Sequence, residues 1–414
     1  MSITTGPLSS AARKRLRSEP RGSMAMCRLL CCRDYCLRSR ARRARLQEQR
    51  AGEVARRARS RDVRDALTDR ASISAGGGRH VVARHPADPR CGFPRIPSLE
   101  HRHTSCAPRI RMTQPRLLEP GAIYLVTRRT LRRHHLFAPD PRIDRIFRYV
   151  LAIAAQRTGV RVHAAVLMST HEHLVVSDPD GRLPVFLHYL HRHVALATKA
   201  VRRWEGAVWD HESTSIVELR TPHAVVEKIA YAIANPVAAA LVPRAKDWPG
   251  VTTRPREIGT ATWRIARPPE YFAANDEKWP PHVELRLEMP RAARDLHLQD
   301  DDFRELVATE VASLESAARA NVRADQRTFV GADRCAKLSP FRRARSWEPI
   351  RDTNPTFAVG RANDDARRES AARVRAFRTA YRQAFESWHR GLREAPFPAG
   401  TWLMRERYAA PIAA

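Results

Sequence analysis

The sequence predicts an α+β fold, in which an antiparallel sheet carries packed helices and is followed by a mostly helical C-terminal extension. Three observations support this prediction. Short runs rich in β-branched and aromatic residues predict strands, and longer segments with apolar residues at helical spacing predict helices. These segments alternate in a fixed order that begins near Pro120.

The four predicted strands are short and apolar. The first, at residues 122–127, reads Ala-Ile-Tyr-Leu-Val-Thr and combines β-branched with aromatic side chains. The others are expected at residues 160–167, 173–177 and 215–219. The turn Asp178-Pro-Asp-Gly181 follows the third strand and has the residues that turns favour.

The three helices predicted between these strands each have a recognisable boundary. Residues 141–158 carry apolar side chains at helical spacing, and Gly159 is expected to end that helix. Residues 183–204 form the second helix, with a proline in its first turn. The third spans residues 222–241, where Asn235-Pro236 is expected to break or kink it.

This order is strand, helix, strand, strand, helix, strand, helix, the split β-α-β pattern of a ferredoxin-like sandwich. Such a fold implies an antiparallel sheet with helices on one face. We assign residues 112–253 to this domain and residues 254–414 to the C-terminal extension. In the extension, residues 263–290 are proline-rich and predicted to be irregular, whereas residues 301–323 and 367–392 are predicted helices.

The segment before this domain, residues 1–111, is rich in Arg, Ser, Gly and Pro and is predicted to be disordered. We hypothesise that Met112 is the natural start. Four cysteines in this segment allow two interpretations, a metal site on one helical face or a reduced disordered chain: Cys27, Cys31, Cys32 and Cys36. Sparse cysteines elsewhere fit a cytoplasmic protein.

The charge of the chain indicates the class of partner. Lys and Arg number 74 against 44 Asp and Glu, a formal net charge of +30. Such an excess is typical of proteins that bind nucleic acid, although a bias toward arginine also follows from a GC-rich genome. No apolar run reaches the roughly 18 residues of a membrane span, so no membrane partner is expected.

A His-x-His motif is the most specific chemical signal. His171 and His173 fall on one face of a predicted strand, because side chains two apart share a face, and Glu172 falls on the other. Two imidazoles on a rigid strand are suited to a divalent metal ion. The alternative interpretation is two polar residues on the solvated face of a strand.

Four stretches of residues 119–253 resemble the REP-associated and insertion-sequence tyrosine transposases, the single-strand-cutting branch of the HUH nucleases. They are Gly121-Ala-Ile-Tyr-Leu-Val-Thr-Arg-Arg129, Val166-Leu-Met-Ser-Thr-His-Glu-His-Leu-Val175, Trp204-Glu-Gly-Ala-Val-Trp209, and Tyr231-Ala-Ile-Ala-Asn-Pro-Val-Ala-Ala-Ala-Leu-Val242 with the trailing Asp247-Trp248-Pro249. The Asn-Pro-Val inside a helix is the most specific of these. Glu172 departs from the family, in which the middle position is usually hydrophobic.

The resemblance implies transesterification on single-stranded DNA, in which a helix-borne tyrosine attacks a phosphate held by Mg²⁺ or Mn²⁺. His171 and His173 are then the metal ligands. The family's tyrosine is expected near residue 193 or 194, where this chain has His193 and Val194. Two interpretations remain. Either Tyr189 is the nucleophile and His193 the third metal ligand, or Tyr189 is a core aromatic and the protein is a non-cleaving DNA-binding relative.

Six arginines are candidates for DNA contacts. Four follow the first strand and two end the second helix: Arg128, Arg129, Arg132, Arg133, Arg202 and Arg203. The expected partner is single-stranded or hairpin DNA, with a homodimer as a further candidate assembly and a bacterial cytoplasmic, nucleoid-associated location. An RNA-binding ferredoxin-like module is a third function, and it requires an exposed sheet face with aromatic side chains.

Overall fold

A computed structural model describes residues 114–211, 214–345 and 355–413. These residues belong to one compact unit, 106–414, and the other unit of the chain, 1–105, lies outside the described residues. The predicted disordered segment 1–111, its cysteine cluster and the Met112 start therefore also lie outside them. Within the described ranges, no helix is both long enough and apolar enough to cross a membrane.

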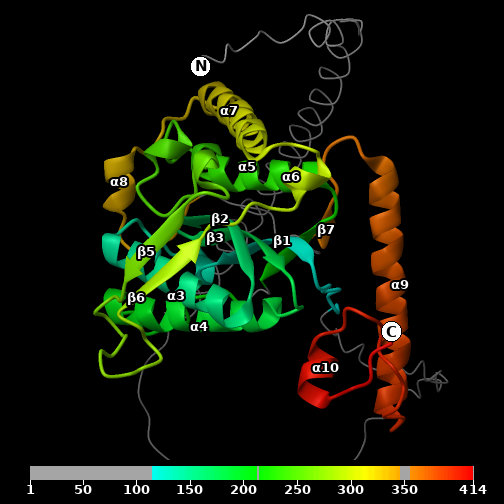
Figure 1. The fold of residues 1–414 in the computed structure, drawn as a ribbon. Coiled ribbons are helices and arrows are strands. Elements are labelled where there is room, and N and C mark those ends of the chain that lie inside the picture. Colours follow the sequence, from blue (N-terminus) through cyan, green and yellow to red (C-terminus); the bar gives the residue numbers. More distant parts are fainter. Residues whose placement is uncertain (1–113, 212–213, 346–354, 414) are drawn as a thin grey trace, which may run out of the picture. The chain divides into compact units, whose positions relative to one another are not determined.

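The core of the fold is a five-stranded sheet with the order β2-β3-β1-β4-β7 (Figure 1). Its first four strands are the predicted ones: β1 (Ala122–Arg129), β2 (Arg161–Met168), β3 (His171–Asp178) and β4 (Ser215–Leu219). They pair antiparallel, in the order of a ferredoxin-like sandwich. The short β7 (Phe357–Ala358) pairs parallel with β4, so the whole sheet is mixed.

Helices cover both faces of this sheet, whereas the sequence predicted helices on one. On one face α3 (Pro141–Thr158) and α4 (Leu183–Arg202) pack against Tyr124 and Val126. On the other, α5 (Pro222–Ala238) and α7 (Asp300–Ala324) pack against Ile123 and Leu125 (Figure 1). The open sheet face that an RNA-binding module requires is therefore covered in the described structure.

The remaining elements lie mainly in the C-terminal extension. The prediction that residues 263–290 are irregular is partly wrong. Two pentapeptides near the ends of this segment pair as a second, two-stranded sheet: β5 (Thr262–Ala266) and β6 (His282–Arg286). Apolar periodicity also did not predict the short helices: η1 (Leu131–Arg133), η2 (Ala245–Asp247), η3 (Pro255–Glu257), α6 (Ala292–Asp295), α8 (Ala332–Ala336) and α10 (Leu403–Tyr408).

The long helix α9 (Asp364–His389) is the predicted last helix of the extension. Asn363 caps it by accepting a hydrogen bond from the backbone N–H of Ala366. Its aromatic face packs around the fully buried Phe397, so the C-terminal segment docks on this helix.

The predicted helix boundaries hold at α3 and shift at α5. The Asp140 side chain accepts from the backbone N–H of Arg142 and caps α3, and Gly159 ends it at a φ of 72° that favours glycine. Pro236 lies inside α5 and does not break it, because the helix continues to Ala238. Asn235 therefore occupies a regular helical position one turn after Tyr231.

The buried His163 on β2 links the stability of the fold to pH. Its ring is buried, with Nδ1 2.8 Å from the Glu288 carbonyl and Nε2 2.6 Å from the Ser177 hydroxyl. Burial lowers its pKa to about 4. Because the unfolded chain binds this proton with a pKa near 6.5, native stability is lost as the pH falls from about 6.5 toward 4.

We expect His163→Gln to remove this part of the pH dependence. Between pH 7 and pH 4.5 the wild-type chain should lose about 2–3 kcal/mol more of its free energy of unfolding than the variant. Urea denaturation at the two pH values measures the difference. Parallel losses in the two proteins would show that His163 does not contribute.

Candidate functional site

The histidine pair (His171 and His173) begins β3 and faces α5. Antiparallel pairing with β1 places His171 opposite Arg129 and His173 opposite Thr127. The two rings lie 4.7 Å apart between centroids and meet edge to face. The sequence prediction that both side chains share one face is therefore confirmed by the strand geometry.

Each ring of the histidine pair has one nitrogen held by a threonine. Nδ1 of His173 lies 2.8 Å from the Thr127 hydroxyl, and Nδ1 of His171 lies 3.0 Å from the Thr170 hydroxyl. A ring whose Nδ1–H donates to a hydroxyl oxygen has an Nε2 lone pair for a ligand. Hydrogen bonding of this kind orients metal-ligating histidines.

The surroundings keep both rings uncharged. Burial, together with the positive charges of Arg129 and Arg133, lowers the pKa of His171 to about 3. Burial also holds the pKa of His173 well below its ordinary value. Neutral imidazole is the form that ligates metal ions.

Helix α5 brings two side chains to the histidine pair. Neither was among the predicted site residues. The Asn235 amide nitrogen lies 3.0 Å from Nε2 of His173. The Tyr231 ring contacts the His173 ring at 5.5 Å between centroids, and 43% of Tyr231 is exposed. Their spacing of four on one helix is the sequence signal that would have identified them together.

A buried tryptophan fixes the hairpin that carries the histidine pair. The Trp248 indole N–H donates to the Leu167 carbonyl near the end of β2, at 3.0 Å. The Trp248 ring packs with Met168 of β2 and Ala232 of α5 in one apolar cluster. Trp248 of the Asp-Trp-Pro motif thus helps to hold α5 against the strands of this hairpin.

The residues present fit a metal ion with an incomplete protein shell. Among residues 114–211, 214–345 and 355–413, no group of three or more His, Cys, Asp or Glu side chains is positioned to bind one ion. The donors that do converge are the two imidazoles and, after rotation of its amide, the Asn235 oxygen. Three neutral ligands leave positions for water and for a phosphate oxygen.

The structure does not bring Tyr189 and His193 to the histidine pair. Both lie on α4, on the opposite face of the sheet, with their rings 4.4 Å apart. Arg157 lies 5.0 Å from the Tyr189 ring, and the Tyr271 hydroxyl lies 3.0 Å from Nδ1 of His193. The expected third-ligand role of His193 thus has no geometric support here.

Glu172 points away from the histidine pair, as predicted, into a fully buried environment. Its Oε1 lies 2.5 Å from Nε2 of His191, and Nδ1 of His191 lies 2.8 Å from an Arg128 nitrogen. Burial lowers the pKa of His191, which the Glu172 charge opposes. The Trp209 indole N–H donates to the His191 carbonyl at 2.8 Å. The Arg128 guanidinium lies 5.3 Å from the centroid of the Trp209 ring.

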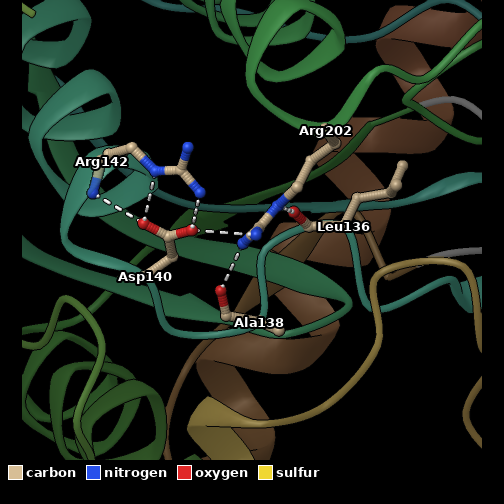
Figure 2. Close-up of polar contacts among 5 residues, drawn as sticks. All are labelled: Leu136, Ala138, Asp140, Arg142 and Arg202. Atoms are coloured by element: carbon tan, nitrogen blue, oxygen red, sulfur yellow. Dashed lines mark hydrogen bonds and ion pairs between the residues drawn. The ribbon is translucent and has the colours of Figure 1, made fainter.

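Two of the six candidate DNA-binding arginines have structural roles. Arg128 belongs to the buried contacts around Glu172. Arg202 is 11% exposed and donates to Asp140 and to the carbonyls of Leu136 and Ala138, as Figure 2 shows. It therefore ties the end of α4 to the segment that precedes α3.

The other four candidates lie where DNA contacts remain feasible. Arg129 and Arg133 place positive charge near His171. Arg132 and Arg203 are exposed, and Arg203 occupies a left-handed position at the end of α4.

We expect Arg202→Met to lower the free energy of unfolding by about 2–3 kcal/mol, because it removes three hydrogen bonds from a charged donor and leaves two carbonyls unpaired. The neighbouring Arg203→Met, at an exposed position, should change it by less than about 0.5 kcal/mol. Urea denaturation of both variants gives the comparison. Equal effects would contradict the structural role of Arg202.

Comparisons with known proteins give a distant structural similarity. No protein-family model and no curated protein sequence matches the chain. Among solved structures, it is similar to a REP-associated tyrosine transposase bound to a REP hairpin, with 17% identity, a TM-score of 0.31, and coverage of 35% of this chain and 84% of that one. It is also similar to a "putative transposase" from Deinococcus radiodurans R1, with 19% identity, a TM-score of 0.21, and coverage of 26% and 85%.

Proposed function

We propose that the protein is a transposase-like enzyme that cuts and joins single-stranded DNA by metal-assisted tyrosine transesterification, with Tyr231 as the nucleophile. The observation that carries the proposal is the convergence of an exposed tyrosine, an asparagine and two neutral histidines between β3 and α5. The sequence resemblance to tyrosine transposases is an independent support.

His171, His173 and the Asn235 amide oxygen would hold Mg²⁺ or Mn²⁺. A bound ion of this kind neutralises phosphate charge and orients the phosphate for attack. The Tyr231 oxygen forms a bond to phosphorus as the bond from phosphorus to the 3′ oxygen breaks. The phenol proton passes to solvent, the 3′ oxygen takes up a proton, and the 5′ phosphate remains on the tyrosine.

Tyr231 fits this role better than Tyr189 for reasons of position. It contacts a histidine of the pair, is exposed to an incoming strand, and has the Lys228 ammonium 5.6 Å from its ring centroid. Burial raises the pKa of Tyr189, which disfavours the phenolate needed for attack. The sequence offered Tyr189 as the nucleophile, so an experiment that compares Tyr231 with Tyr189 decides between the two tyrosines.

The second candidate function is a DNA-binding protein that does not cleave. The buried Glu172 favours it, since it places a carboxylate where related enzymes usually have a hydrophobic residue. In this case, the histidine pair and Tyr231 would contact DNA without chemistry. A homodimer remains a prediction under either function.

Covalent trapping tests the proposal. The full chain is incubated with Mn²⁺ and a labelled single-stranded oligonucleotide that contains a hairpin, and products are separated under denaturing conditions. We expect a labelled protein adduct that depends on Mn²⁺, and peptide mapping should place it on Tyr231. If the chain binds several oligonucleotide sequences and forms an adduct with none of them, the second candidate is supported instead.

A further inference from the structure

A segment of the C-terminal extension lies against the loop that follows β1, beside the histidine pair. The backbone N–H of His135 donates to the Arg342 carbonyl, and that of Ala344 donates to the Arg133 carbonyl, both at 3.0 Å. The Arg343 Nε lies 3.3 Å from Nε2 of His134, and the same two residues form a β-bridge. Residues about 200 apart in the chain thus share one surface.

Positive charge converges on this surface. Phe341 is followed by three exposed arginines, Arg342, Arg343 and Arg345, which add to Arg132 and Arg133 of the loop. We call these five arginines the basic rim. The backbone contacts of Arg133 with Ala344 and of Arg342 with His135 place both arginines at this junction, and burial together with their charges lowers the pKa of the partly buried His135. Asp210 is the carboxylate at this edge, and it accepts from the backbone N–H of Arg132.

The backbone of the loop is held in an unfavourable conformation beneath the rim. Arg132 and Arg133 both have positive φ angles, 47° and 58°, which L-residues rarely adopt. The hydrogen bond from Ala344 and the one accepted by Asp210 hold this turn. Docking of the extension therefore fixes where the loop arginines project.

An exposed aromatic ring completes the surface. Phe341 is 56% exposed, although a phenyl ring gains by burial. It rests on Trp204, with ring centroids 5.9 Å apart and planes inclined by 33°. Aromatic rings beside a basic groove are the elements with which proteins bind single strands, because bases stack on the rings while cations contact the phosphates.

We propose that the basic rim and Phe341 bind the single-stranded DNA that flanks the reacting phosphate, so that the C-terminal extension forms part of the substrate site. This inference rests on the proposed function and names the part of the chain that holds its substrate. The loop that bears the rim adjoins the histidine pair, because Arg129 lies opposite His171 in the strand pairing and the Thr130 backbone N–H donates to the Thr170 carbonyl. Arg342 and Arg345 contact phosphates, and Phe341 stacks on a base.

Binding measured without divalent metal separates this inference from the chemistry. The affinity of the full chain for a fluorescent single-stranded oligonucleotide is followed by anisotropy in EDTA over a range of salt concentrations. We expect Arg342→Gln/Arg345→Gln to weaken binding about tenfold at 0.1 M salt and to lower the slope of log K against log salt by about 1.4, the value for two phosphate contacts. Arg342→Lys/Arg345→Lys should restore the slope.

A matched control removes the same charge elsewhere. Arg161 and Arg294 are exposed, and Arg161 starts β2 at the end of the sheet opposite the histidine pair. Arg161→Gln/Arg294→Gln should change affinity by less than about twofold, with the slope unaltered. Equal weakening by the two double variants would show that the affinity depends only on the net charge of the chain, and this result would overturn the inference.

The aromatic contact has its own test. Phe341→Ala should weaken binding by about fivefold or more at every salt concentration, and this loss should vanish on an oligonucleotide with abasic positions. Phe341→Trp should bind as the wild type does. Thermal unfolding checks that each variant is folded.

The possible failures are distinguishable. If Mn²⁺ yields the Tyr231 adduct but the rim variants bind as the wild type does, the inference falls and the proposed function stands. If the rim variants lose affinity as expected but no adduct forms, the surface is that of a non-cleaving DNA-binding protein. No binding by the wild-type chain, or tighter binding of RNA of the same sequence, would overturn the inference.

Discussion

Tyr231→Phe should abolish the covalent protein–DNA adduct, with a loss on the order of 10³-fold or more in the rate of its formation. The variant lacks only the attacking oxygen. The ring keeps its contact with His173, and 43% of Tyr231 is exposed, so the variant should fold. Quantifying the Mn²⁺-dependent adduct on denaturing gels measures the loss.

Tyr189→Phe is the matched control for this prediction. It removes the same atom from the opposite face of the sheet, where Tyr189 contacts His193 and Arg157. Adduct formation should continue within about threefold of the wild-type rate, the change expected when no transition-state contact is removed. Loss of the adduct in Tyr189→Phe and its survival in Tyr231→Phe would return the nucleophile to α4 and remove the basis of the proposed site.

His191→Leu should lower the free energy of unfolding by about 3–5 kcal/mol, because it leaves the Glu172 carboxylate buried without its hydrogen-bond donor. Glu172 has no exposed side-chain surface, and its second oxygen already has no partner among the described residues. Equilibrium denaturation at neutral pH measures the loss.

The double variant Glu172→Leu/His191→Leu should recover at least half of that loss. Replacing both members of a buried pair with apolar residues of similar size is often neutral or stabilising, whereas removing one member is not. It also places a hydrophobic residue between the two histidines, as in the transposases that the sequence resembles. Additive effects of the two substitutions would show that Glu172 and His191 do not stabilise one another.

The same pair of variants tests the structural role of Glu172 between the two histidines. The His191 contact gives this carboxylate a local physical role, because the glutamate on β3 and the histidine on α4 satisfy one another across the interface. Its presence therefore does not require that the histidine pair behind it has lost its chemistry.

The main elements of the ferredoxin-like domain followed from local sequence. The β-branched and apolar composition of β1 and β3, the apolar spacing of α3 and α4, and Gly159 after α3 are local features, so the sequence predicts these elements directly. The shared face of His171 and His173 follows from the alternation of side chains along a strand. Strands β5 and β6 were missed because they flank a proline-rich segment that predicts irregular structure, and β7 was missed because two residues carry no periodic signal.

Which chemical groups share a site was decided by tertiary structure. The sequence determined that two histidines face the same way, and it contained Tyr231 and Asn235 four residues apart, but it did not determine which helix covers the histidines. Packing of α5 on that sheet face, fixed by Trp248, brought Asn235 and Tyr231 to the pair, whereas α4 holds Tyr189 on the opposite face. Local periodicity specifies the orientation of a side chain on its own element, whereas contact between elements depends on how complementary apolar faces bury one another.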